Sequence, residues 1–121
     1  MARHNETGKN GELLAADWLR EHGYNIIHSN WRHYHYEIDI IASRHEILHF
    51  IEVKTRRNTN FGHPEESVSK KKFSSLMNAA EEYLFQQPQW KRVQYDVLSI
   101  TQLKGQPVEY FLIEDVYYSN L

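Results

Sequence analysis

The stretch YEIDIIASRHEILHFIEVKT, residues 36–55, decides the fold. Residues 36–42 and 47–55 are rich in β-branched and aromatic side chains, and the polar segment 43–46 separates them. Apolar runs of this kind, bounded by polar residues, are typical of strands, and a short polar segment between two of them is typical of a hairpin turn. We therefore expect two antiparallel strands joined by a tight turn.

The register of this hairpin decides whether its acidic side chains meet. Alternate residues of a strand share a face, so Glu52 and Lys54 point the same way. If Ser43 pairs with Glu46, Asp39 lies on the same face as Glu52, one diagonal step away. A turn of odd length would separate the two acids, because a slip of one residue reverses every side chain. Their convergence therefore requires an even turn or a compensating bulge.

The rest of the chain predicts two helices and three more strands. The second helix is long enough for a right-handed crossover, which would make the strand after it parallel to a central strand. We expect an α/β (α+β) fold with a mixed central sheet flanked by helices, in a single domain over residues 1–121. The expected elements are a helix over 5–22, a strand over 24–29, a helix over 67–86, and strands over 93–100 and 108–113.

Glu12 occupies the apolar stripe of the first predicted helix, at helical spacing from Ala15, Ala16 and Leu19. A carboxylate on a buried stripe is unfavourable unless a partner satisfies it. Glu12 is therefore either a site residue or a buried acid bonded to an arginine or a backbone N–H, and the sequence leaves both readings open.

The predicted hairpin brings carboxylates together with a lysine. Asp39 and Glu52 would repel each other at short range, and a divalent cation would relieve that repulsion. Oxygen ligands in a chain without cysteine favour Mg²⁺ or Mn²⁺. Such a cation can polarise a phosphodiester and activate water, and Lys54 could orient that water or neutralise developing charge. Basic side chains that could hold backbone phosphates follow at Arg56, Arg57 and Lys70 to Lys72.

Asp39 followed by Glu52-Val53-Lys54 resembles the Asp…Glu-x-Lys signature of the restriction-endonuclease-like, or PD-(D/E)xK, superfamily, whose core is αβββαβ. A wider set of motifs is similar to the YraN-like family of bacterial proteins, predicted endonucleases that resemble archaeal Holliday-junction resolvases. These motifs are Gly8…Gly11-Glu12, Gly23-Tyr24, Asn30-Trp31-Arg32, EIDIIA at 37–42, FIEVKTR at 50–56, Phe61-Gly62-x-Pro64-Glu65, Val68…Lys72…Leu76 and Tyr95-Asp96-Val97.

The resemblance implies an endonuclease acting on nucleic acid, chiefly on structured or branched DNA. A homodimer would suit a symmetric junction, which needs two sites related by a two-fold axis. This sequence departs from the family at Tyr36, where many members carry glycine. The implied active-site residues are Asp39, Glu52, Lys54 and Glu12, with the three acids as metal ligands and Lys72 as a phosphate contact.

The composition qualifies this expectation. The net charge is −2, with 14 basic and 16 acidic residues, whereas a nucleic-acid-binding protein usually has a basic excess. A non-catalytic module that binds nucleic acid or protein on the same fold is therefore the alternative function. The absence of cysteine and of an apolar leader or spanning segment predicts a cytoplasmic protein without a membrane.

Two further interpretations remain open. His33 and His35, with His45 and His49 nearby in sequence, could build a Zn²⁺ or Ni²⁺ site, although His49 should point away from the carboxylates. An aromatic C-terminus could instead serve protein contacts through Tyr110, Phe111, Tyr117 and Tyr118. We leave Asp96 outside the site, as an acid at a strand start or a partner to a nearby base.

Overall fold

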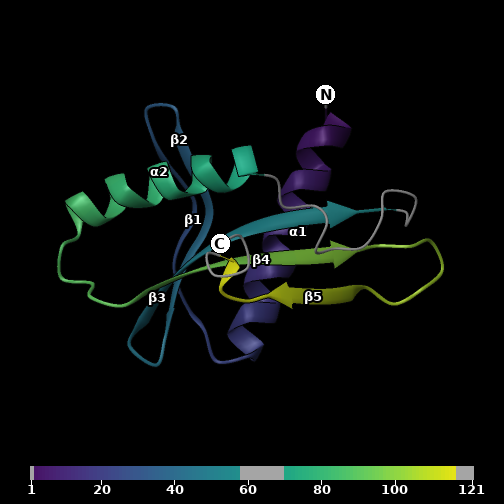
Figure 1. Cartoon of the computed structure of the whole chain (residues 1–121). Coiled ribbons are helices and arrows are strands. Elements are labelled where there is room, and N and C mark those ends of the chain that lie inside the picture. Colours follow the sequence, from purple (N-terminus) through teal and green to yellow (C-terminus); the bar gives the residue numbers. More distant parts are fainter. Residues whose placement is uncertain (1, 58–69, 117–121) are drawn as a thin grey trace.

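The computed structural model describes residues 2–57 and 70–116, with the backbone alone described at 2–9 and at 70. The expected order of elements is confirmed (Figure 1). Strand β1 runs on to His33 instead of ending at Ser29, while the predicted helix start at 67–69 and the motif residues 61–68 lie outside the described residues. The elements are α1 (Ala2–Glu21), β1 (Asn25–His33), β2 (Tyr36–Arg44), β3 (Ile47–Arg56), α2 (Lys70–Gln86), β4 (Val93–Thr101) and β5 (Glu109–Ile113).

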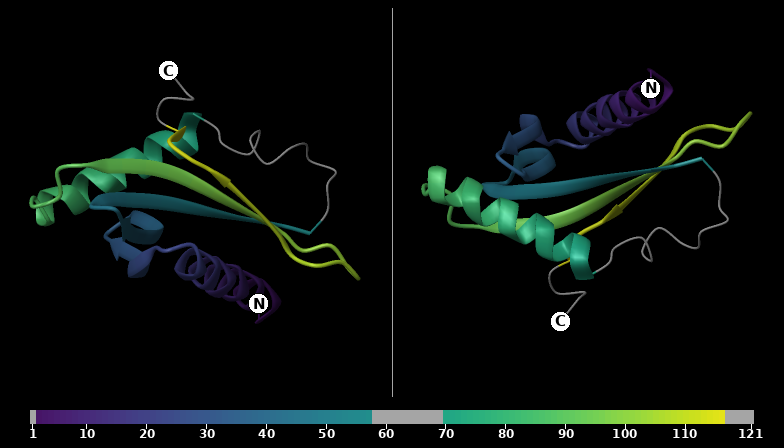
Figure 2. Two further views of the ribbon diagram at one scale, coloured as in Figure 1. Left: turned by 90° about the horizontal axis from the view of Figure 1, so that it is seen from below. Right: turned by 90° about the horizontal axis from the view of Figure 1, so that it is seen from above.

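The five strands form one mixed sheet in the order β1-β2-β3-β4-β5. Strands β3 and β4 are parallel and every other neighbouring pair is antiparallel, as the crossover through α2 predicts. Figure 2 shows α1 and α2 on opposite faces of the sheet. The fold is therefore the expected α/β (α+β) arrangement, with the αβββαβ order followed by an edge strand.

Each helix buries one apolar face against its own side of the sheet, which gives two hydrophobic clusters. The sheet faces are apolar because β2, β3 and β4 contribute buried side chains to both sides. The α2 side contains Ile38, Ile41, Phe50, Leu76, Tyr83 and Val97, and the α1 side contains Leu19, Ile40, Ala42, Ile51, Leu98 and Ile100. Over the described residues, no helix is long and apolar enough to cross a membrane.

The turn between β2 and β3 is formed by His45 and Glu46 alone, since Arg44 pairs with Ile47. Both turn residues have positive φ, 53° and 66°, which gives the primed twist that suits a two-residue hairpin. The expected pairing of Ser43 with Glu46 is wrong by two residues. The turn is nevertheless even, as the convergence of the acids requires.

Arg44 explains the difference in register. Its guanidinium lies 4.2 Å from the centre of the buried Tyr24 ring and 3.5 Å from the Glu114 carboxylate. These contacts stabilise Arg44 as the last residue of β2, where the sequence pattern alone places it in a polar turn.

Candidate active site

Strand β2 parts from β3 at Asp39. The last paired residues are Ile40 and Ile51. Figure 1 shows one end of the β1–β2 hairpin turning away from β3. Ile38 packs on the α2 side whereas Ile40 packs on the α1 side, although residues two apart in a regular strand share a face. The strand is therefore irregular at Asp39. Continued by one residue, the register would set Asp39 opposite Glu52, whereas the expected register set them one diagonal step apart.

The Asp39 carboxylate takes the place of the departing β2 backbone. Its Oδ2 atom accepts a hydrogen bond from the backbone N–H of Val53 at 2.8 Å. This bond satisfies a donor that β2 no longer reaches, and it fixes the orientation of the carboxylate toward β3.

Glu52 and Lys54 project from the next part of β3. Lys54 Nζ lies 3.2 Å from Glu52 Oε1, and both side chains are largely buried, with 20% of each exposed. Both line one cavity of about 610 Å³ with Asp39 and with Lys72 of α2, so these four predicted residues converge. We call this the site cavity, and its lining is Glu37, Ile38, Asp39, Glu52, Val53, Lys54, Lys71, Lys72, Ser75 and Leu76.

Burial raises the pKa of Asp39 to about 6, against an ordinary value of 3.8. The hydrogen bond from Val53 lowers this pKa, while the negative charges of Glu52, Glu12 and Glu37 raise it further. A buried carboxyl group among other acids gains free energy by binding a proton or a cation. The electrostatics of this group are therefore those expected of a cation ligand.

The lysines on the other side of the cavity form a pair. Burial lowers the pKa of Lys54, but its hydrogen bond to Lys72 and its charge interaction and hydrogen bond with Glu52 outweigh that effect and raise the pKa. The pKa of Lys72 is lowered, first by the hydrogen bond to Lys54 and then by burial. These opposite shifts share one cause, because a proton on one amine opposes a proton on its hydrogen-bonded neighbour.

Glu12 lies near the acids but outside the lining of the site cavity. Its pKa is raised by burial and then by the charge of Glu37, while Arg32 opposes the shift. Its own charge raises the pKa of Asp39. In the part of the chain that the structure describes, no three His, Cys, Asp or Glu side chains are grouped closely enough to hold a metal. Metal ligation by Glu12 therefore stays a prediction.

The donor set at the parting of β2 and β3 suits a small hard cation. Asp39 and Glu52 offer carboxylate oxygens only, beside open cavity space. Mg²⁺ is commonly held by one or two carboxylates, with water and substrate phosphate completing its coordination. Asp39 and Glu52 would hold such an ion without a third protein acid.

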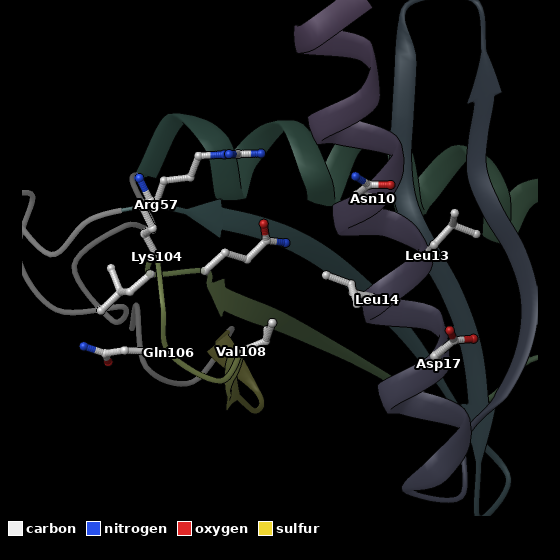
Figure 3. A pocket seen from close by; sticks show the side chains of 10 residues that line it. Asn10, Leu13, Leu14, Asp17, Arg57, Lys104, Gln106 and Val108 are labelled. Atoms are coloured by element: carbon white, nitrogen blue, oxygen red, sulfur yellow. The ribbon is translucent and has the colours of Figure 1, made fainter.

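The residues predicted to contact phosphates do not all lie at the site cavity. Lys72 lines the site cavity, but Arg56 does not. Arg57 lines a different cavity of about 640 Å³, between α1 and the turn that joins β4 to β5. Figure 3 shows Arg57 with Lys104 in that cavity, across from Leu14 of α1. Strand β3 ends at Arg56, so Arg57 lies beyond the strand and its direction is not set by strand alternation.

Besides Asp39, Glu52, Lys54 and Lys72, three charged or hydroxyl-bearing side chains line the site cavity. Glu37 lies two positions before Asp39, strand alternation predicts that it shares the face of Asp39, and it lines the same cavity. Ser75 follows Lys72 by three residues on α2, so helical spacing could have found it. Lys71 lines the cavity beside Lys72, and no periodicity in the sequence distinguishes it from Lys70.

The histidines do not assemble a metal site among the described residues. His49 is buried on the face opposite to Phe50, as expected, and its Nδ1 atom lies 2.7 Å from Asp96 Oδ2. Asp96 also accepts hydrogen bonds from the Gln94 amide and the Asp115 backbone N–H. Asp96 is thus the partner of a nearby base, one of the two roles left open for it.

The aromatic residues of the C-terminal strand have mixed positions. The Tyr110 ring stacks on Trp18 with 5.5 Å between centres, whereas Phe111 is 49% exposed. Tyr117 and Tyr118 lie outside the described residues.

The fold and this site together define a mixed-sheet α/β protein with an acidic pair and a lysine where two central strands part. The chain belongs to the family described as "Uncharacterised protein family UPF0102", whose model matches residues 11–100, and the expected YraN-like membership is thereby confirmed. A UPF0102 protein of Bacteroides thetaiotaomicron is 50% identical over 84 residues, which cover 69% of each chain. UPF0102 proteins of Flavobacterium psychrophilum and Phocaeicola vulgatus are 37% and 40% identical, and each match covers 98% of this chain and 98% and 97% of theirs.

Proposed function

We propose that this protein is a divalent-metal-dependent endonuclease that hydrolyses phosphodiester bonds in structured or branched DNA. One observation carries the proposal: Asp39 and Glu52, from two strands, line the same cavity as Lys54. The raised pKa of Asp39 supports it, because an enzyme site concentrates groups whose charge states are shifted by their surroundings.

The proposed roles follow from the contacts of each side chain. Mg²⁺ or Mn²⁺ held by Asp39 and Glu52 would supply Lewis-acid activation of the phosphodiester and of water. Asp39 uses Oδ2 for the Val53 N–H, so Oδ1 would be the oxygen offered to the ion. Lys54 carries the positive charge that can stabilise the non-bridging phosphate oxygens as the attacking water adds and the leaving oxygen departs. Lys72 would contact the adjacent phosphate.

Cleavage assays test this proposal. Labelled single-stranded, duplex, flapped and four-way-junction DNA, with matching RNA, would be incubated with Mg²⁺, Mn²⁺ or EDTA. We expect metal-dependent cleavage of branched DNA by the wild type, lost in both Asp39→Ala and Lys54→Ala. Asp17→Ala is the matched control, because Asp17 is an exposed acid of α1 whose recorded ion pair is with Arg20. Cleavage that survives both site substitutions would overturn the assignment.

A non-catalytic module is the second candidate function. Lys54 is already paired with Glu52 at 3.2 Å, and a bound nucleic acid could use the basic side of the cavity without turnover. In that case Asp39→Ala would leave affinity unchanged or increase it, and affinity would fall steeply with salt. Binding of nucleic acid without cleavage of any substrate would support the non-catalytic module.

A homodimer forms part of the endonuclease proposal, because two copies related by a two-fold axis could cut both strands of a symmetric junction. Light scattering on the protein alone and on its junction complex measures this directly. Two protein chains per junction are expected, and one chain per junction contradicts the dimer.

A further inference from the structure

The turn that joins β1 to β2 presents an aromatic ring to solvent. Tyr34 is 90% exposed and has a positive φ of 56°. A non-glycine residue in this conformation is usually Asn or Asp, and a bulky ring there is strained. Because the side chain is 90% exposed, packing among the described residues buries little of its ring.

Neighbouring rings extend this surface. The His33 ring meets the edge of Tyr34 with 4.6 Å between centres, and His35 lies 4.3 Å from Tyr36 in a tilted arrangement. We call Tyr34, His35 and Tyr36 the aromatic tip. Figure 1 shows this end of the hairpin rising beside α2.

The aromatic tip adjoins the site cavity. A smaller cavity of about 300 Å³ is lined by His35, Tyr36, Glu37, Ser75 and Asn78. The two cavities share Glu37 and Ser75 as lining residues. The smaller cavity therefore lies between β2 and α2, next to the site cavity, with His35 and Tyr36 of the aromatic tip in its lining. We call it the tip groove.

Contacts with α2 hold the hairpin in place beside the groove. His33 Nε2 lies 3.1 Å from Glu82 Oε1, and His33 Nδ1 lies 3.4 Å from the Gln86 amide nitrogen. The Trp31 ring also meets Tyr83 of α2 edge-on, with 5.4 Å between centres. The hairpin that carries the aromatic tip is thus held against α2 before any ligand arrives, which reduces the entropy lost on binding.

We propose that the tip groove receives unpaired nucleotides next to the phosphate at the acidic pair, with their bases stacked on the aromatic tip. This inference rests on the proposed function for the position of that phosphate. Every nucleobase has a π-face that stacks on aromatic side chains without strong sequence preference. The Asn78 amide and the Ser75 hydroxyl at the groove wall can donate to and accept from a base edge.

The chemistry favours unpaired over paired bases. In a duplex the faces and pairing edges of a base are occupied by its neighbours, so only a splayed or single-stranded base can stack on a protein ring. Lys71 and Lys72 line the adjoining site cavity, where backbone phosphates would lie. The substrate class is therefore a DNA strand with unpaired nucleotides beside the cleaved bond.

Binding measured without cleavage tests the inference. The full chain is titrated into labelled single-stranded, flapped and blunt duplex DNA in EDTA, with anisotropy as the readout. The wild type should bind unpaired DNA more tightly than blunt duplex. Tyr34→Ala should weaken binding to unpaired DNA about tenfold, while Tyr34→Trp should retain it. Phe111→Ala is the matched control, because Phe111 is a 49% exposed ring on β5, at the opposite edge of the sheet from β1.

A second readout reports stacking itself. The fluorescent base analogue 2-aminopurine, placed at the unpaired position, should be quenched on binding to the wild type and stay bright with Tyr34→Ala. Equal affinity and equal quenching for wild type and Tyr34→Ala would overturn the inference. Neither readout depends on turnover. The binding results can therefore support stacking on the aromatic tip even if no DNA is cleaved, and they can contradict stacking even if DNA is cleaved.

Discussion

Asp39 and Val53 are joined by a hydrogen bond of 2.8 Å between the Asp39 carboxylate and the Val53 backbone N–H, at the point where β2 leaves β3. The bond places a buried carboxylate beside the part of β3 that β2 no longer pairs with. It links the fold to the site, because the same departure of β2 opens the space that Glu52 and Lys54 line. The stability of the folded protein should therefore depend strongly on whether the Asp39 carboxyl group is charged.

Asp39→Asn should stabilise the protein at high pH. Because the folded-state pKa of Asp39, about 6, exceeds its unfolded value, the folded protein binds the proton more tightly. The free energy of unfolding therefore falls as pH rises through the window from about 4 to 6, by at most about 3 kcal/mol. Asparagine keeps an oxygen for Val53 and has no charge to bury. Urea denaturation should show a more stable variant at pH 8 and nearly equal stabilities at pH 4.

Asp17→Asn is the control for this experiment. Asp17 is 70% exposed in its ion pair with Arg20, so its removal should change stability by less than about 0.5 kcal/mol. If Asp39→Asn shifted stability equally at both pH values, the buried charge would not be the cause.

Lys54 and Lys72 should affect different kinetic constants if the protein is the proposed nuclease. Lys54 is held against Glu52 and keeps its proton, so Lys54→Ala should lower kcat by about 10²-fold to 10³-fold. Lys72 is the more exposed lysine, and Lys72→Ala should mainly raise KM through loss of a phosphate contact. Steady-state kinetics on one branched substrate measures both. A pure KM effect of Lys54→Ala would remove its proposed role in the chemical step.

Gly11→Ala should destabilise the protein although alanine favours helices. A Cβ at Gly11 would meet the hydroxyl of Thr55, because α1 approaches β3 closely at this position. The gain of about 1 kcal/mol in helix propensity should be outweighed by this overlap. Thermal unfolding should give a lower Tm for Gly11→Ala and recovery in Gly11→Ala with Thr55→Ala. A higher Tm for the single variant would show that Thr55 simply turns aside.

Glu46→Gly should stabilise the β2–β3 hairpin. Glu46 has a φ of 66°, a conformation that glycine adopts without the steric penalty of a Cβ. The free energy of unfolding should increase by about 1 kcal/mol. Glu46→Ala retains the Cβ and is the matched control, which should bring no gain. Equal gains in both variants would indicate that loss of charge, and not backbone conformation, is responsible.

The strands and their order could be predicted because the signals are local. Alternation in 36–55 indicates both central strands, and it also places Glu52 and Lys54 on one face without knowledge of the rest of the fold. The sequence shows that Asp39 and Glu52 meet only if the β2–β3 turn has an even number of residues, but it does not show where that turn lies. Its position depends on Arg44 packing over Tyr24, a contact between residues 20 positions apart in sequence.

The bend at Asp39 and the extension of β1 could not be predicted from local pattern. Both depend on the β1–β2 hairpin lying against α2, where His33 contacts Glu82 across 49 positions of sequence. Helical periodicity identifies Glu12 as an acid on an apolar stripe. It cannot show that Glu12 lies outside the lining of the site cavity. Arg57 is close to Lys54 in sequence, but it lies beyond the end of β3 and lines another cavity, which the local pattern could not show.

The most direct measurement of the central claim is the anomalous signal of Mn²⁺ in crystals of the wild type and of Asp39→Asn soaked in the ion. We predict a peak between the carboxylates of Asp39 and Glu52 in the wild type, abolished in the variant, whose fold is retained. A fully soaked wild-type crystal with no peak between these two carboxylates would contradict the metal site and, with it, the proposed nuclease.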